Sequence, residues 1–319
     1  MKKILCVLMS CLLFVMAGCS GHSKNLKFGA ADIGGVYYSF ASTFTQLADN
    51  EIDGYTFETK TTAGSVANLR LISDGYIDLA IVQADLLSDA YNATGTFADK
   101  KYQKGYKAVA SLYTECCQIV VRKDSGITGI DDLINKTVSV GASESGTEKN
   151  AEQILKMSGI TDELINKVNM DYTEAAEKLK AGEIDAFFCT AGTRTEVIGQ
   201  LSKECDIRLI SLDDKCIDKM LSAYSLCEKY TIPAGTYNGQ DSDVTTIGVK
   251  AVLIAKQSLS DDVIKNVTKT IYEHADDFKY ATSLDITFDI NTAADGVDIP
   301  FHSGATAYYT EHGINVLTE

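Results

Sequence analysis

Hydrophobic residues follow two different periods along this chain. Residues 56–61 alternate between apolar and polar positions, which is typical of a strand with one buried face. Residues 65–73 instead repeat apolar positions every three or four residues, as an amphipathic helix does. Alternation of such segments predicts an α/β protein. The expected strands are residues 26–30, 56–61, 77–83, 137–140 and 184–189, and the expected helices lie within residues 34–47, 65–73, 148–157 and 174–180.

One piece of this pattern occurs twice. Residues 71–80 and 179–187 both run from the end of a helix through a glycine to an Ile-Asp pair, and then into an apolar strand. Glycine supplies the left-handed conformation that ends many helices. We expect Asp78 and Asp185 to bind backbone amides at the turn that follows. The two copies predict two similar lobes that face each other, as in two-lobed binding proteins.

Short polar turns that contain glycine precede three of the predicted helices, at residues 34–38, 61–65 and 145–147. A helix N-terminus presents unpaired N–H groups and a partial positive charge, so it accepts a carboxylate or a similar anion. We therefore expect Ser65 and Thr147 to direct donors at opposite ends of one ligand, with Gln83 at a strand end facing the same space. The alternative is that both hydroxyls only cap their own helices and that Gln83 lies at the surface.

The first residues have the composition of an export signal. Lys2 and Lys3 precede an uncharged apolar stretch, residues 4–17, which is shorter than the roughly 20 residues needed to span a bilayer. It ends in Gly18-Cys19, which resembles the lipobox of bacterial lipoproteins. We expect residues 1–18 to be a signal peptide, Cys19 to be lipidated, and residues 19–24 to be a tether that holds the protein on the extracytoplasmic face of the cell membrane. An ordinary signal peptide cleaved nearby is the alternative.

Length and charge limit the domain organisation and the partners. A chain of 319 residues is longer than one hydrophobic core normally serves, which favours two domains. The formal net charge of −15 disfavours nucleic acid and anionic lipid, because those partners require a basic face. An anionic ligand would need local dipoles or a lone cation. Arg194, in a polar turn at a strand end, is the candidate cation, and a surface ion pair is its alternative role.

Motifs for catalysis, cofactors or metals do not appear in the sequence. The four histidines lie in no Gly-x-Ser-x-Gly or His-Glu-x-x-His frame, and residues 29–35 fit no dinucleotide-binding glycine pattern. The cysteines after Cys19 form no Cys-x-x-Cys pair, and whether Cys205, Cys216 and Cys227 pair with one another is left open. We therefore predict a binding protein with no catalytic residues, no cofactor and no metal.

Several blocks in the same order resemble the TAXI-type solute receptors of TRAP (tripartite ATP-independent periplasmic) transporters. They are residues 33–38, 64–70 and 78–83, residues 138–147, residues 232–249, and residues 301–309. The resemblance implies a type II periplasmic-binding-protein fold, with two α/β lobes joined by two crossover strands near Tyr113 and Lys256. Lobe 1 would comprise residues 25–113 and 257–319, and lobe 2 residues 114–256.

The same resemblance implies a mechanism and a set of contacts. The receptor would close around a small organic anion or amino acid, with a preference for glutamate-like or dicarboxylate ligands, and deliver it to a TRAP-type permease. Ser143 and Glu144 stand where relatives often have Pro and Gly, and Glu144 adds a negative charge that speaks against a purely dicarboxylate ligand. Carried over by position, with Arg194 added from its place in the turn, the expected ligand-binding residues are Gly35, Tyr37, Ser65, Val66, Gln83, Ser145, Gly146, Thr147 and Arg194.

Two other hypotheses stay open. The first is a substrate-binding lipoprotein of an ATP-driven importer, for example one for amino acids or aromatic sulfonates. The second is an exported hydrolase, which requires a clustered nucleophile and base that the sequence does not display.

Overall fold

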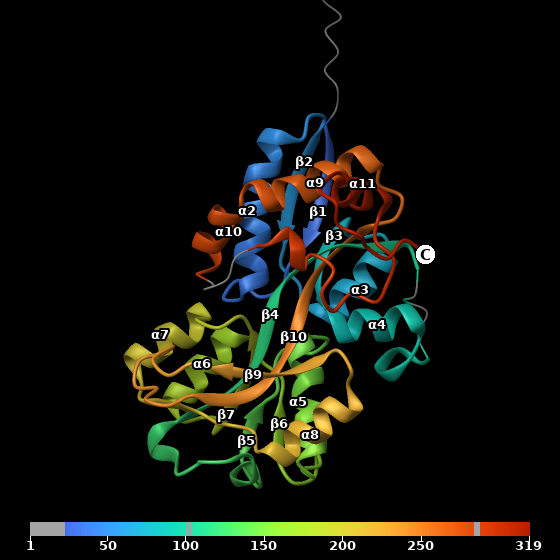
Figure 1. Ribbon diagram of the computed structural model, residues 1–319. Coiled ribbons are helices and arrows are strands. Elements are labelled where there is room, and N and C mark those ends of the chain that lie inside the picture. Colours follow the sequence, from blue (N-terminus) through green and yellow to red (C-terminus); the bar gives the residue numbers. More distant parts are fainter. Residues whose placement is uncertain (1–22, 100–101, 103, 284–287) are drawn as a thin grey trace, which may run out of the picture.

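The computed structural model describes residues 23–99, 102, 104–283 and 288–319. The expected signal peptide and Cys19 lie outside the described residues. The chain forms two α/β lobes, one above the other in Figure 1, joined by two long strands that run through both. This is the predicted two-lobed α/β fold with two crossover strands. No helix in the described part of the chain combines the length and the apolar character needed to cross a bilayer.

The sheet is arranged in the same way in both lobes, from its outer edge to the crossover strands. Its path is β2-β1-β3-β10-β4-β7-β5-β6, so β2, β1, β3 and β10 correspond to β6, β5, β7 and β4. Within each lobe the first three strands are parallel, and the crossover strands β4 and β10 are antiparallel to their neighbours. The strands are β1 Lys24–Gly29, β2 Tyr55–Lys60, β3 Leu79–Gln83, β4 Tyr106–Arg122, β5 Thr137–Ser139, β6 Asn166–Val168, β7 Ala186–Ala191, β8 Ile207–Leu209, β9 Cys227–Ile232 and β10 Val244–Lys256.

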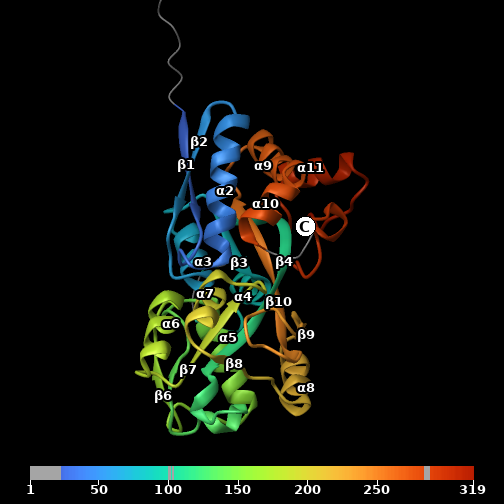
Figure 2. The same cartoon turned by 90° about the vertical axis from the view of Figure 1, so that its left-hand side faces the viewer.

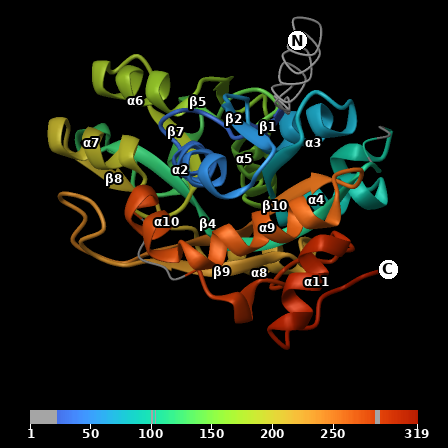
Figure 3. The same cartoon turned by 90° about the horizontal axis from the view of Figure 1, so that it is seen from above.

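Helices cover both lobes, and the chain returns to lobe 1 after β10. Figure 2 and the view from above in Figure 3 show α9, α10 and α11 gathered on lobe 1, where α9 and α10 pack against α2. The rings of Phe40 and Phe278 stack there with centroids 4.4 Å apart. The α-helices are α2 Val36–Glu51, α3 Ser65–Ser73, α4 Ala84–Asn92, α5 Gly146–Met157, α6 Tyr172–Ala181, α7 Glu196–Glu204, α8 Asp214–Ala223, α9 Asp261–Glu273, α10 Ala275–Thr282 and α11 Ser303–Glu311.

The repeated Ile-Asp turn has the same bonding in both lobes. Asp78 Oδ2 accepts a hydrogen bond from the backbone N–H of Lys27 at 2.9 Å, and Asp185 Oδ2 accepts one from the N–H of Thr137 at 2.8 Å. In each case the aspartate N–H also donates to the carbonyl of that partner. Each aspartate therefore ties the start of a central strand to the strand beside it. The sequence repeat is a structural repeat, as predicted.

Crossover strand β10 pairs with β9 through Val249 and with β3 from Ala251 onward. This pairing favours a crossing closer to Lys250 than to Lys256. The lobe boundaries at residues 113 and 256 therefore stay a prediction. The six cysteines in the described residues, among them Cys205, Cys216 and Cys227, are free thiols.

Candidate functional site

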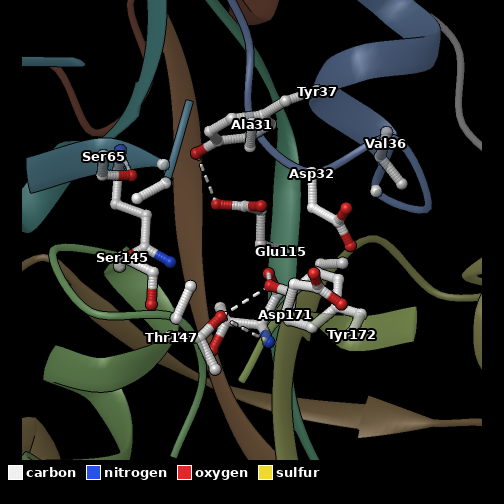
Figure 4. A pocket seen from close by; sticks show the side chains of 18 residues that line it. Ala31, Asp32, Val36, Tyr37, Ser65, Glu115, Ser145, Thr147, Asp171 and Tyr172 are labelled. Carbon is white, nitrogen blue, oxygen red and sulfur yellow. Dashed lines mark hydrogen bonds between the residues drawn. The ribbon is translucent and has the colours of Figure 1, made fainter. Parts of the chain in front are cut away.

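A cavity lies between the two lobes, with an empty volume of about 480 Å³ that includes its opening to solvent. Loops and helix starts of both lobes surround it, and strand β4 passes behind it (Figure 4). The lining residues from lobe 1 are Ala31, Asp32, Gly35, Val36, Tyr37, Ala63, Gly64, Ser65 and Gln83. Those from lobe 2 are Ala142, Ser145, Gly146, Thr147, Asp171, Tyr172, Thr190 and Ala191, and Glu115 comes from β4.

The lining residues of the two lobes occupy corresponding positions. The strand and helix β1–α2 correspond to β5–α5, and α3–β3 correspond to α6–β7, as the sheet order and the Ile-Asp turns require. The matched pairs are Asp32 with Ala142, Gly35 with Ser145, Val36 with Gly146, Tyr37 with Thr147, Gly64 with Asp171, Ser65 with Tyr172, and Gln83 with Thr190. The two lobes therefore line the cavity with equivalent backbone positions that carry different side chains.

The starts of α3 and α5 meet at one end of the cavity. Gly64, before α3, has φ +119°, which glycine adopts without strain, and it lies against Ser145. The Ala67 N–H donates to the carbonyl of Glu144 at 3.0 Å, across the lobes. A Cβ on Gly146 would overlap the carboxamide of Gln83, so only glycine allows this approach. The two helix starts share a cavity as predicted, but they lie side by side instead of at opposite ends of a ligand.

The two hydroxyls predicted to face a ligand do not cap their own helices. Ser65 Oγ accepts from the Gln83 N–H at 3.1 Å, and α3 has no side-chain cap. Thr147 Oγ1 lies 2.6 Å from the hydroxyl of Tyr172 and accepts from the Thr190 N–H at 3.2 Å. Ser145, by contrast, caps α5 by accepting from the Glu148 N–H. Ser65 and Thr147 thus fix the strand ends and the wall of the cavity.

Several polar atoms of the lining are buried without a hydrogen-bond partner among the described residues. They include Gln83 Oε1 and Thr190 Oγ1, on side chains that are 2% and 3% exposed, and Asp32 Oδ2. Gln83 Nε2 donates across the lobes to Asn150 Oδ1 at 3.0 Å, which fixes the carboxamide in place. An unsatisfied buried polar group costs about 1–3 kcal/mol. A polar ligand in the cavity would remove that cost.

Glu115 is a buried carboxyl in the middle of crossover strand β4. Its Oε2 accepts a hydrogen bond of 2.8 Å from the hydroxyl of Tyr37. Burial raises the pKa of Glu115 to about 8, although the hydrogen bonds from Tyr37 and Gln83 lower it. At neutral pH, without a ligand, this group is therefore largely protonated. It is able to donate to a ligand acceptor or to become charged beside a ligand cation.

A pair of acidic residues, one from each lobe, also lines the cavity. Asp32 follows β1, and Asp171 is the N-cap of α6, where Oδ1 accepts from the Glu174 N–H at 2.8 Å. Burial, and then the nearby Asp171 carboxylate, raise the pKa of Asp32, while backbone hydrogen bonds, the first from Tyr172, lower it. No lysine, arginine or histidine is among the described residues that line the cavity. The cavity therefore offers a dicarboxylate helix dipoles but no cationic side chain.

Seven of the nine predicted site residues line the cavity, and their contact with a ligand stays a prediction. Val66 is buried in α3 and Arg194 lies exposed in the turn before α7 with φ +65°, and neither lines the cavity. Sequence reasoning missed Asp32, Glu115 and Asp171 because acidic side chains on an acidic chain are usually solvated. One signal was available, since Glu115 is the only acidic residue within residues 106–122, near the expected crossing.

A further contact joins the lobes beside the cavity. Arg70 of α3 donates from Nε to Glu144 Oε1 at 3.2 Å and from Nη2 to Glu144 Oε2 at 2.6 Å. Glu144 has φ +65°, a left-handed conformation that is uncommon for a residue with a side chain. The pair is a two-pronged clasp between a lobe 1 helix and a lobe 2 turn.

Comparison with known proteins identifies the family and supports the fold. The model of the NMT1-like family matches residues 28–313. PhnD1 from Prochlorococcus marinus, solved with methylphosphonate, is similar, with TM-score 0.59, 12% identity, and coverage of 83% of this chain and 93% of that one. A putative L-cystine ABC transporter protein from Listeria monocytogenes gives TM-score 0.53, 13% identity, and coverage of 82% and 94%. The periplasmic binding protein BugD gives 0.55, 11% identity, and 81% and 85%.

These matches correct the resemblance to TAXI receptors. The matching family is the NMT1-like family, and one of the similar structures is described as a putative L-cystine ABC transporter protein. The predicted TAXI family and TRAP-type permease are therefore wrong. Three of the quoted blocks, residues 33–38, 64–70 and 138–147, contain the starts of α2, α3 and α5, which belong to the fold as a whole. Such blocks predict the fold well and the transport system poorly.

Proposed function

The chain belongs to the NMT1-like family, and from this membership and the cavity between its lobes we propose that it is an extracytoplasmic solute receptor of an ATP-driven importer. It captures a small polar solute between the lobes and presents it to the membrane permease. It performs no chemistry on the solute. The similarity to structures described as a periplasmic binding protein and as an ABC transporter protein supports this reading.

The observation that carries the proposal is the paired lining of the cavity. Corresponding helix starts and strand ends of both lobes surround it, and Gln83 and Thr190 place at corresponding strand ends oxygens that no described residue hydrogen-bonds. A ligand that satisfies groups of both lobes stabilises the closed arrangement over an open one, so that binding and closure are coupled. The proposed contacts are Gly35, Tyr37, Ser65, Gln83, Ser145, Gly146 and Thr147.

The test is a thermal-shift screen of the purified protein against a broad library of amino acids, amines, carboxylates, sugars and nucleosides. A ligand at 100 times its Kd should raise the free energy of unfolding by about 2.7 kcal/mol. Ser65→Ala should weaken a hit because Ser65 Oγ anchors the end of β3 at Gln83. If no compound stabilises the protein, or if a hit binds with Ser65 and Thr147 both replaced as tightly as before, the site is wrong.

The energy source is tested separately, by ligand uptake in cells that contain the receptor and its permease. Uptake should stop with vanadate, which blocks ATP hydrolysis by importers, and should survive an ionophore that collapses ion gradients. The opposite result would exclude an ATP-driven partner.

We also propose that Cys19 carries a lipid anchor that holds the receptor on the extracytoplasmic face of the membrane. The motif at residues 16–19 supports this placement. Cys19→Ala should release the protein from the membrane fraction, and mass spectrometry of the first mature residue should detect the acyl chains. An unmodified Cys19 would contradict the anchor.

A further inference from the structure

The cavity has two corresponding ends with opposite electrostatic character. At one end, which we call the acid end, the start of α2 meets the start of α6, and Gly35 lies against the ring of Tyr172. At the other, the neutral end, the start of α5 meets the start of α3, where Ser145 lies against Gly64. Since α2 corresponds to α5 and α6 to α3, the two ends are built alike. Each has one helix with a side-chain cap and one without.

The ends differ in their carboxylates. Asp32 and Asp171 both lie at the acid end, and their partners in the repeat are Ala142 and Gly64, both at the neutral end. Figure 4 shows Asp32 and Asp171 on one side of the cavity and Ser65 and Ser145 on the other, with Glu115 between them. Asp32 and Asp171 lie close enough for the Asp171 carboxylate to disfavour the charged form of Asp32. The acid end therefore holds two carboxyl groups whose mutual repulsion is offset by no cationic side chain of the described lining.

The electrostatic field at the neutral end is positive. The start of α3 has no side-chain cap, and the dipoles of α3 and α5 both point their positive ends at this place. No carboxylate of the described lining lies there to offset them. Ala31, Val36, Ala63 and Ala191 add apolar surface to the lining, and Gln83 and Thr190 supply buried oxygens without a hydrogen-bond partner in the described part of the chain. Apolar walls and polar ends suit an organic ligand with charge at both of its ends.

We infer that the ligand of the proposed receptor carries a protonated nitrogen, held between Asp32 and Asp171, and an anionic or strongly accepting group, held at the starts of α3 and α5. The inference rests on the proposed function and names the chemical class of its solute. The cation removes the repulsion that closure creates, so closure is favoured only with a ligand of the right charge. A dicarboxylate would place its second negative charge at the acid end, where the repulsion increases.

The experiment compares matched compounds by isothermal titration calorimetry on the wild-type protein. Each set contains an amino acid, the same molecule without its amino group, and the same molecule without its α-carboxylate: L-leucine with 4-methylpentanoate and isopentylamine, and L-glutamate with glutarate and 4-aminobutyrate. A compound with both charges should bind at least about tenfold more tightly than its anion-only partner, since a close charge pair that is partly desolvated contributes more than about 1.4 kcal/mol. Divalent metal ions are also titrated alone, to test whether the two carboxylates bind a metal instead of a protonated nitrogen.

Two variants test whether the preference for a protonated nitrogen depends on the acid end. Asp32→Asn and Asp171→Asn should each remove most of the preference for the nitrogen-bearing compound, and Asp32→Asn should also raise the thermal stability of the ligand-free protein because it removes the repulsion. Asparagine also caps helices, so Asp171→Asn keeps the start of α6. The control is Asp53→Asn, an equal change of charge at an exposed turn, which should change neither the affinity nor the preference.

The outcomes separate this inference from the proposed function. Tight binding of an anion-only or uncharged compound, or of a metal ion alone, overturns the inference and leaves a solute receptor. A preference for the nitrogen that survives in both variants overturns the assignment to Asp32 and Asp171. If no compound of these sets or of the broad library binds the wild-type protein, the receptor function fails, and the inference fails with it.

Discussion

The two lobes share a framework and differ where that framework meets the cavity. Asp78 and Asp185 make the same pair of bonds to Lys27 and Thr137, and the same order of strands and helices follows each. The exposure of residues 32–37 repeats in residues 142–147, position by position. Yet Asp32 corresponds to Ala142, Ser65 to Tyr172 and Gly64 to Asp171. The fold thus depends on what the halves have in common, and the chemistry of the site depends on where they differ.

The largest expected effect on stability comes from the second residue after Gln83 in lobe 1, which corresponds to the second residue after Thr190 in lobe 2. In lobe 1 that residue is Asp85, buried in the first turn of α4, and in lobe 2 it is Gly192. Burial, and to a smaller extent Asp89, raise the pKa of Asp85 to about 6. The raised pKa means that the folded protein prefers the protonated form. The stability that this preference contributes is complete below about pH 4 and is lost as the pH rises through 6.

Asp85→Asn should therefore stabilise the protein by up to about 3 kcal/mol at pH 8 and by almost nothing at pH 4. Urea denaturation at the two pH values measures the difference. Glu115 faces Asp85 and also titrates, so the comparison is made within each pH and not between them. Asp53→Asn, at an exposed turn, is the control and should change the stability equally little at both pH values. An equal gain from Asp85→Asn at pH 4 and pH 8 would show that the ionisation of Asp85 has no part in it.

The strands, helix starts and Ile-Asp turns could be predicted from the sequence, because they depend on residues that are neighbours in the chain. The prediction of a helix over 65–73 matches α3 at both ends, and the two Ile-Asp turns were found in advance. The acid end of the cavity could not be predicted from the sequence. Asp32 and Asp171 are far apart in the sequence, and each alone resembles an ordinary polar turn or N-cap. Only the folded arrangement of the lobes brings them to one end of a cavity.

The next effect concerns how closely the lobes approach at the neutral end. Gly146 allows the carboxamide of Gln83 to pack against its backbone, while the corresponding residue of lobe 1, Val36, carries a full side chain. Gly146→Ala should hold the lobes apart and weaken ligand binding by about 1–3 kcal/mol, or about 5- to 150-fold in Kd. Gly199→Ala, in α7 with open space around the added methyl, is the matched control and should leave Kd unchanged. Unchanged binding by Gly146→Ala would mean that the bound state does not need this contact.

The smallest expected effect on ligand binding comes from an ion pair across the lobes that only one end of the cavity has. Arg70 and Glu144 clasp the neutral end, whereas their corresponding residues at the acid end are Glu177 and Gly34, which cannot form an ion pair. Both side chains of the clasp are more than a third exposed, at 34% and 41%, so the pair should contribute only about 0.2–1 kcal/mol to closure. Arg70→Gln and Glu144→Gln should each weaken ligand binding by no more than about fivefold, and the double variant should be no weaker than either one. High salt should reduce the difference from wild type, since exposed pairs are screened. Equal and additive losses from the two single variants, unaffected by salt, would show that these residues act separately and that the lobes close without a clasp.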